Sequence, residues 1–143
     1  MVKVGSVVAI FYSTVNKRTR TSKLMLDKKG IIKDKHYDEN IDRSILLASL
    51  ESYELASQNM IDISYGALGE NILLDYNPYH LLLGSKLQIG GVILEITQHC
   101  TLCKSFSKID TKLPKLLKDD RGIFAKVIEM GEIEEGNDIY LLS

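Results

Sequence analysis

Short apolar runs separated by polar and turn-forming residues dominate the pattern of this chain. Runs rich in β-branched and aromatic residues, bounded by Gly, Asn, Asp or Pro, are typical of β-strands joined by tight connections. The predicted strands cover residues 2–12, 24–26, 44–47, 72–74, 86–89, 92–97, 123–128 and 138–142. The polar segment 13–22 is predicted to be a loop, and 131–137 a turn.

Two further segments have the spacing of helices. After Ser49, which is a good N-cap, apolar residues recur at steps of three and four and predict a helix over about 50–59. A similar spacing from Phe106 to Leu117, interrupted near Pro114, predicts helical turns packed on a core. Many short strands with two helical insertions in 143 residues predict one domain, 1–143, of mainly β (α+β) class. The expected architecture is a β-barrel with a few short peripheral α-helices.

The stretch 86–103 combines a predicted hairpin with the only thiols of the protein. Gly90-Gly91 separates two apolar runs, and Gly-Gly takes the positive φ values that two-residue hairpin turns need. The second strand leads directly into Gln98-His-Cys-Thr-Leu-Cys103. A rigid strand is therefore expected to set the direction in which both cysteine thiols point.

Composition and charge limit the function classes. Hydrophobic residues make up 45% and charged residues 26%, as in ordinary soluble proteins, and no apolar run approaches the roughly 18 residues of a membrane span. The first residues lack the features of a secretory signal, so we expect a cytoplasmic protein without a membrane partner. Nucleic acid is not the expected partner, because the net charge is -1 and the most basic stretch has no aromatic residues for base stacking.

The charges are unevenly distributed along the chain. Residues 17–35 contain eight basic and two acidic side chains, whereas 129–138 contains five acidic ones. Two interpretations of the basic stretch remain open. It is either a solvated surface or an attraction site for an anionic ligand, with phosphate as the obvious candidate.

The Cys-x-x-Cys pair allows several kinds of chemistry. A zinc site would need two more ligands, and His36 and His80 stand at no recognisable spacing. A thioredoxin-like redox pair would need a βαβ setting, which a barrel does not supply. A single reactive thiol at Cys103 would be stabilised as thiolate by Lys104 and by backbone amides at the start of 104–109. Alternatively, both cysteines are small buried hydrophobic residues.

The chain resembles MOSC domains, named for the C-terminal part of molybdenum cofactor sulfurase, and in particular their short stand-alone bacterial members. The matching positions are Gly30, Asp34-Lys-His36, Arg43, Ile45-Leu-Leu47, Gly66-Ala-Leu-Gly69-Glu70-Asn71-Ile72, Gly84, Leu87-Gln-Ile-Gly90, Leu94-Glu-Ile-Thr97-Gln98, Cys103, Arg121-Gly-Ile-Phe-Ala125, Val127, Gly131, Ile133 and Gly136. The match runs in one order over nearly the whole chain.

The resemblance implies a MOSC-type β-barrel that binds molybdenum cofactor (molybdopterin) or a related sulfur-bearing species. Cys103 takes the position of the family's characteristic cysteine, which carries sulfur or ligates molybdenum, so it is the expected catalytic residue and metal ligand. The expected cofactor-binding residues are Asp34, His36, Arg43, Glu70, Asn71 and Arg121.

Two interpretations of these expected cofactor-binding residues remain open. Arg43 and the basic residues from Lys17 onward suit a pterin phosphate, because guanidinium matches phosphate geometry. His36 and Arg43 would otherwise belong to an internal salt-bridge network with Asp34, Asp38 and Glu70. Glu70 and Asn71 would otherwise bond the backbone of the barrel loops.

The expected function is sulfur transfer or cofactor-dependent reduction of a small substrate. A non-catalytic module that binds, stores or senses the cofactor is the alternative. The chain shows no aminotransferase-like pyridoxal phosphate domain, so a sulfur carrier would need a donor such as a cysteine desulfurase, and a reductase an electron-transfer protein. Cys100 is either a resolving thiol for Cys103 or a bystander.

Overall fold

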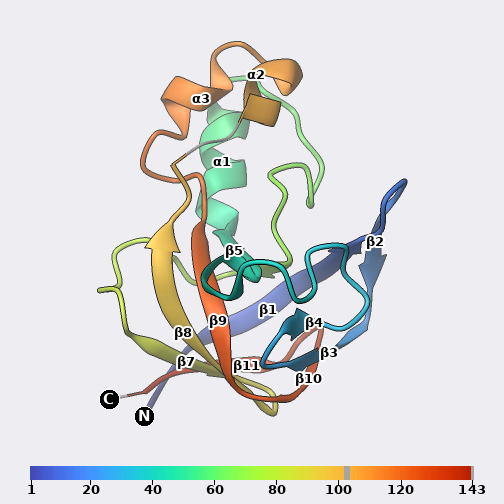
Figure 1. Cartoon of the computed structure of the whole chain (residues 1–143). Coiled ribbons are helices and arrows are strands. Elements are labelled where there is room, and N and C mark those ends of the chain that lie inside the picture. The colour runs from blue at the N-terminus through green and yellow to red at the C-terminus, as the bar shows by residue number, and fades with distance from the viewer. Residues whose placement is uncertain (102–103, 143) are drawn as a thin grey trace.

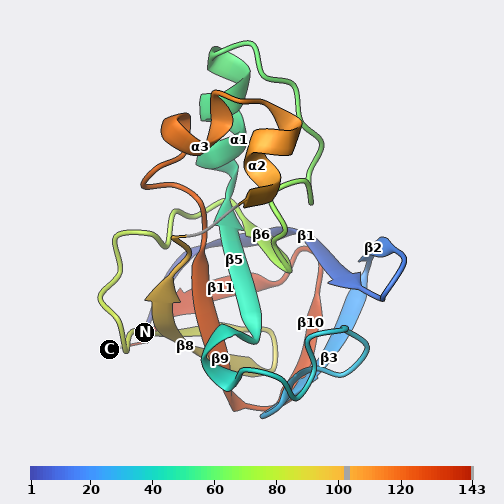
Figure 2. The same ribbon diagram turned by 45° about the horizontal axis from the view of Figure 1, so that its top comes forward.

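The computed structural model describes residues 1–101 and 104–142, and of Lys104 and Ser105 only the backbone. Strands build a barrel, and the α-helices lie together on one side of it (Figures 1 and 2). The strands are β1 (Val2–Ser13), β2 (Arg18–Thr21), β3 (Lys23–Asp27), β4 (Gly30–Ile31), β5 (Ile45–Ser49), β6 (Ile72–Leu74), β7 (Lys86–Ile89), β8 (Val92–His99), β9 (Ile123–Glu129), β10 (Gly131–Glu134) and β11 (Asp138–Leu141). The helices are α1 (Leu50–Gln58), α2 (Lys104–Ile109), α3 (Leu113–Leu116) and the 3-10 helix η1 (Ile41–Arg43).

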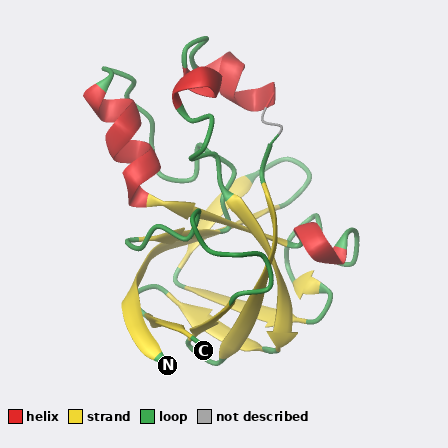
Figure 3. Ribbon diagram, turned by 90° about the vertical axis from the view of Figure 1, so that its left-hand side faces the viewer, coloured by secondary structure: helices red, strands yellow, loops and turns green. Residues whose placement is uncertain are grey.

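The main sheet closes on itself. Its order is β11-β7-β8-β9-β5-β6-β1, and β1 also pairs with β11, which completes a ring of seven strands in the described part of the chain. Figure 3 shows these strands curving around a common interior. β2 extends from β1 outside the ring, and β10, β3 and β4 form a smaller sheet. The predicted mainly β barrel with short peripheral helices is confirmed.

The helix that was predicted after Ser49 makes a crossover between parallel strands. β5 and β6 pair in parallel, which requires a long connection between them, and α1 lies in that connection. The Ser49 hydroxyl accepts a hydrogen bond from the Glu51 amide at 3.1 Å, so it caps the helix as its sequence position predicts.

The predicted hairpin at Gly90-Gly91 is also confirmed. Ile89 pairs with Val92 across a two-residue turn, and Gly90 has a φ of +55°. A side chain at Gly90 would place Cβ 2.9 Å from the Glu132 carbonyl oxygen. Glycine is thus required both for the turn and for the close approach of the neighbouring chain.

Two predicted connections proved to be strands. The segment 13–22 contains β2, which pairs with β1, and 131–137 contains β10, which pairs with β3. β2 is polar throughout, and β10 is polar except for Ile133, which is fully buried in the barrel core. Exposed charge pairs add to the ladder hydrogen bonds of these strands. Arg20 Nε lies 2.8 Å from Glu135 Oε1, and Lys23 Nζ lies 3.6 Å from Glu134 Oε1. Part of the basic stretch therefore pairs with the acidic one.

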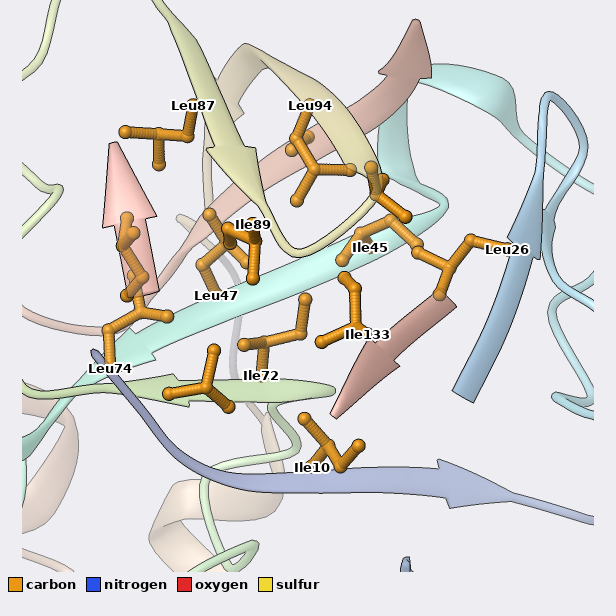
Figure 4. Close-up of a cluster of buried hydrophobic side chains, with 14 of the residues drawn as sticks. Ile10, Leu26, Ile45, Leu47, Ile72, Leu74, Leu87, Ile89, Leu94 and Ile133 are labelled. Atoms are coloured by element: carbon orange, nitrogen blue, oxygen red, sulfur yellow. The ribbon is translucent and has the colours of Figure 1, made fainter. Parts of the chain in front are cut away.

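Two apolar clusters hold the fold together. Aliphatic side chains from the ring strands and the small sheet fill the barrel, with residues such as Ile45, Leu47 and Ile72 fully buried (Figure 4). A second cluster, which includes Phe11, Tyr53 and Phe106, packs the helices against the outside of β1, β5 and β6. In the described residues no helix is long and apolar enough to cross a membrane.

Candidate functional site

A pocket of about 580 Å³ opens beside the barrel strands β1 and β5. Its wall comes from separate parts of the chain: the β1–β2 ribbon, the segment 34–44, β5, residues 69–71 and β9. Four of the predicted cofactor residues line it, namely Asp34, His36, Arg43 and Asn71. The fold thus brings together side chains that are up to 37 positions apart in the sequence.

Asp34 fixes the start of the pocket loop. Its side chain is 6% exposed, and Oδ1 accepts from the Ser13 amide at 2.7 Å while Oδ2 accepts from the His36 amide at 3.0 Å. The Lys35 amide also donates to the Ser13 carbonyl at 2.7 Å. The Asp34 carboxylate therefore ties the loop to the end of β1.

Tyr37 and Asp27 hold the same loop against the β3–β4 turn. The Tyr37 hydroxyl donates to Asp27 Oδ2 at 2.5 Å, and this bond raises the pKa of Tyr37 and lowers the pKa of Asp27. The Asp38 amide, at a φ of +59°, donates to the Lys29 carbonyl at 3.0 Å. The loop thus has a defined path before it delivers Arg43.

His36 and Arg43 do not join the salt-bridge network that was considered for them. His36 Nδ1 lies 2.6 Å from Glu39 Oε2, and Asp38 pairs with Lys29 at 3.9 Å. For Arg43 the described residues supply neither a side-chain hydrogen bond nor an ion pair; its guanidinium instead lies over the Phe124 ring at 4.7 Å. The Arg43 guanidinium therefore lines the pocket, and neither of the two pocket carboxylates, Asp34 and Glu39, pairs with it.

The sequence did not single out Arg18, which the structure places in the pocket wall. Its Nε donates to the Gly66 carbonyl at 2.9 Å, Nη1 to Ser13 Oγ at 2.9 Å, and Nη2 to the Glu70 carbonyl. The guanidinium also lies over the Phe11 ring at 5.2 Å. Burial lowers the pKa of Arg18, and the charge of Glu70 opposes this effect. The sequence signal was weak, because Arg18 lay in a predicted loop.

Glu70 and Asn71 bond within the fold, as one of the sequence interpretations held. Glu70 is fully buried and does not line the pocket. Its Oε2 accepts from the Tyr53 hydroxyl at 2.5 Å and from the Gly66 amide at 3.2 Å. Asn71 lines the pocket, but its Oδ1 accepts from the Leu46 amide at 2.9 Å and its Nδ2 donates to the Phe11 carbonyl at 3.3 Å. Asn71 thus joins β5 to β1.

Arg121 lies outside the pocket wall. It donates to the carbonyl oxygens of Thr101 and Pro114, the latter at 2.9 Å, and so connects the end of β8 to α3. The Cys100 amide donates to the Gly122 carbonyl at 3.1 Å, and the Cys100 side chain is buried. Cys103 lies outside the described residues, so its role as the reactive thiol stays a prediction.

The described part of the chain contains no group of three or more His, Cys, Asp or Glu side chains that would hold a metal ion. His80, considered above as a zinc ligand, lies edge-on to Tyr76 with ring centres 5.9 Å apart. The described residues therefore give the zinc interpretation no support.

A family model described as the MOSC domain matches residues 28–140, which include most of the pocket wall and the barrel. This chain belongs to the MOSC domain family. The predicted resemblance is thereby confirmed, and the family is one associated with the molybdenum cofactor.

Solved structures share this MOSC fold. The YUAD protein of Bacillus subtilis matches with a TM-score of 0.84 and 18% identity, over 95% of this chain and 94% of that chain. YiiM of Geobacillus stearothermophilus matches with a TM-score of 0.70 and 17% identity, over 99% and 75% of the two chains. YiiM of Escherichia coli matches with a TM-score of 0.71 and 19% identity, over 96% of this chain and 70% of that chain. At these identities the likeness shows the fold alone, and the comparison with curated proteins gave no match.

Proposed function

We propose that this MOSC domain binds the molybdenum cofactor through its phosphate in the pocket, and that Cys103 carries sulfur or ligates the molybdenum. The observation that carries the proposal is the Arg43 guanidinium, which lines the pocket over Phe124 without a carboxylate partner in the described residues. A cation in this state favours an anionic ligand, because binding does not require an existing ion pair to break.

The other charges of the pocket support an anion. Arg18, Lys35 and Arg43 supply three cations, and Asp34 and Glu39 two carboxylates. Both carboxylates are already engaged, Asp34 by two backbone amides and Glu39 by His36. Lys35 is exposed and has no side-chain partner in the described residues. With His36 neutral, the pocket lining carries three positive and two negative formal charges, and this excess of positive charge favours an anion such as phosphate.

The residues fit a phosphate-bearing organic cofactor. The volume of about 580 Å³ is within the range of ligand pockets, and Phe124 and Leu46 add apolar wall to the polar groups. The protein's own ligand to molybdenum would be the Cys103 thiolate, a soft donor at the position of the family's characteristic cysteine. When bound, the cofactor would supply two-electron or sulfur chemistry that side chains alone do not provide.

The protein's own side chains would bind and orient this group. Arg18 and Arg43 would present planar donors to the phosphate, and Lys35 a mobile charge at the rim. Asp34 would hold the loop in place as the ligand enters. A sulfur carrier would need a donor such as a cysteine desulfurase, and a reductase an electron-transfer protein.

Cofactor retention tests the binding. The protein would be purified from a host that makes the cofactor, and molybdenum and pterin would be measured per chain for wild type, Arg43→Gln and Arg20→Gln. Arg20 is the matched control, because it pairs with Glu135 and does not line the pocket. Arg43→Gln is expected to lose most of the bound pterin while Arg20→Gln keeps it. Equal, negligible pterin in all three proteins would refute cofactor binding.

A second test separates chemistry at Cys103 from passive binding. Wild type and Cys103→Ala would be incubated with a cysteine desulfurase and cysteine, and intact mass would be recorded. Sulfur carriage predicts a gain of one sulfur atom in wild type only. If Cys103→Ala retains as much molybdenum as wild type and neither protein gains sulfur, the domain is a binding or storage module.

A further inference from the structure

We propose that Tyr53 and Glu70 are a buried positioning pair, which holds the guanidinium of Arg18 in the orientation that the pocket needs. Neither side chain lines the pocket. Both act through the loop 64–70, whose carbonyl groups bind Arg18. The inference rests on the proposed function only for the identity of the anion that Arg18 would meet.

The pair connects α1 to this loop inside the fold. The Tyr53 hydroxyl donates to Glu70 Oε2 at 2.5 Å and accepts from the Gly66 amide at 2.9 Å. Glu70 Oε2 accepts from the same amide at 3.2 Å. Tyr53 is 6% exposed and Glu70 0% exposed, so water does not replace these bonds easily. Two buried acceptors, the Tyr53 hydroxyl and Glu70 Oε2, thus fix the position of the Gly66 amide.

The same loop residues present their carbonyl groups to Arg18. The carbonyl oxygen of Gly66 accepts from Arg18 Nε, and that of Glu70 accepts from Nη2. Gly66 has a φ of +91°, and a Cβ there would lie 2.8 Å from Phe11 Cε1, the ring under the guanidinium. The loop, the ring and the guanidinium therefore form one tightly packed unit. A displacement of the loop would move Arg18.

This arrangement leaves Arg18 prepared for an anion. Of its five N–H groups, three bind the acceptors Gly66, Ser13 and Glu70, and one on each Nη has no acceptor in the described residues. A guanidinium that is already fixed loses little side-chain freedom when it binds a ligand. The contribution of Tyr53 and Glu70 to affinity would come from this prior ordering.

The charge of Glu70 and the proposed positioning of Arg18 predict opposite effects of this pair on the affinity for an anion. The Glu70 carboxylate is negative and near Arg18, so by charge alone its presence would weaken an anion at Arg18. Positioning predicts the reverse, namely that loosening the pair weakens anion binding. Tyr53→Phe tests position without a change of charge, because it removes one hydroxyl and keeps the packed ring.

Tyr79→Phe is the matched control. Tyr79 is 8% exposed, and its hydroxyl accepts from the Ser49 amide at 2.8 Å and bonds to Ser52 Oγ at 2.7 Å, outside the pocket wall. Both substitutions therefore remove a buried hydroxyl that holds backbone. A purely structural role of Tyr53 would give the two variants the same behaviour.

The experiment combines two measurements on the full chain. Calorimetric titration with inorganic phosphate at low salt measures the affinity. The NMR signal of the Arg18 Nε–H group reports how well its bond to Gly66 is protected from exchange. This signal is assigned by its loss in Arg18→Lys. We expect Tyr53→Phe to weaken phosphate binding about five- to tenfold and to increase exchange of the Arg18 signal, while Tyr79→Phe changes neither. If Tyr53→Phe does not fold, Glu70→Gln takes its place, and there the protection of the Arg18 signal decides, because this substitution also removes a charge that affects phosphate affinity.

The outcomes separate this inference from the proposed function. Unchanged Arg18 protection in Tyr53→Phe, or an equal change in Tyr79→Phe, overturns the positioning role even if wild type binds phosphate. A selective change in Arg18 protection supports it. If wild type binds no phosphate, the phosphate pocket is overturned, and the Arg18 signal alone decides whether the pair positions this side chain.

Discussion

The guanidinium carbon of Arg43 lies 4.7 Å from the centre of the Phe124 ring. Arg43 ends η1, and Phe124 belongs to β9, whose pairing with Leu46 and Gln98 fixes the ring in the wall of the pocket. This contact holds the cation beside the pocket without neutralising it. Arg18 is held over Phe11 in a similar way, although three of its five N–H groups also donate within the fold.

The aromatic support of Arg43 can be tested at Phe124. Phe124→Leu keeps an apolar side chain but removes the ring, and an exposed cation–π contact contributes ~0.5–1 kcal/mol. We therefore expect phosphate to bind about two- to fivefold more weakly in Phe124→Leu, and as in wild type in Phe124→Tyr. Calorimetric titration measures both. Stronger binding in Phe124→Leu would mean that the ring restrains Arg43 from its ligand.

Asn71 is expected to matter more for stability than an exposed asparagine. Asn71→Ala would leave the Leu46 amide and the Phe11 carbonyl without their side-chain partner, at a cost of ~2–3 kcal/mol in the free energy of unfolding. The Asn59 side chain donates to the Leu55 carbonyl at the exposed end of α1, so Asn59→Ala should cost ~0.5 kcal/mol or less. Urea unfolding of the two variants gives the comparison. Similar costs would show that Asn71 does not join β5 to β1 energetically.

Alanine substitutions at Gly66 and Gly84 distinguish the cost of backbone strain from the cost of a steric clash. Both have positive φ, +91° and +93°, but only at Gly66 would a Cβ meet another side chain, that of Phe11. Gly84→Ala is expected to cost ~1 kcal/mol from strain, and Gly66→Ala a further ~1–3 kcal/mol from overpacking. Thermal and urea unfolding would measure this difference. Equal costs would contradict the close contact of the loop with the Phe11 ring.

Alkaline pH should destabilise the protein through its buried tyrosines. Burial raises the pKa of Tyr79 to about 12 and also raises the pKa of Tyr53, whereas both ionise near pH 10 in an unfolded chain. Above pH 10 the unfolded chain therefore holds fewer protons than the folded one, and the free energy of unfolding falls as pH rises.

The same linkage predicts no effect of these two groups below their unfolded pKa, where both states keep the proton. Urea unfolding between pH 8 and pH 12 would show a loss of ~1–3 kcal/mol that begins near pH 10. The double variant Tyr53→Phe with Tyr79→Phe should lose less over the same interval. An identical pH dependence in wild type and double variant would contradict the linkage.

Much of the barrel could be predicted from the sequence, because its apolar strands bury one face in a common interior. Ile72, Leu87 and Leu94 lie in such runs, and each is fully buried. The Ser49 cap and the Gly90-Gly91 turn were local signals, which depend on a few neighbouring residues. β2 and β10 escaped prediction because polar strands carry no period that distinguishes them from loops.

The sequence by itself determined the strand-rich barrel, the family and the residue types available for an anion site. Which of those residues meet was decided by the tertiary structure. Strand register placed Arg18 opposite Ser13 in the pocket wall, and the α1 crossover placed Tyr53 against Glu70. Ser13 and Arg18 are only five positions apart and Tyr53 and Glu70 only 17, yet no local apolar pattern encodes either contact. The physical reason is that the pairing of strands and the packing of α1, rather than the spacing of residues, set the distances between their side chains.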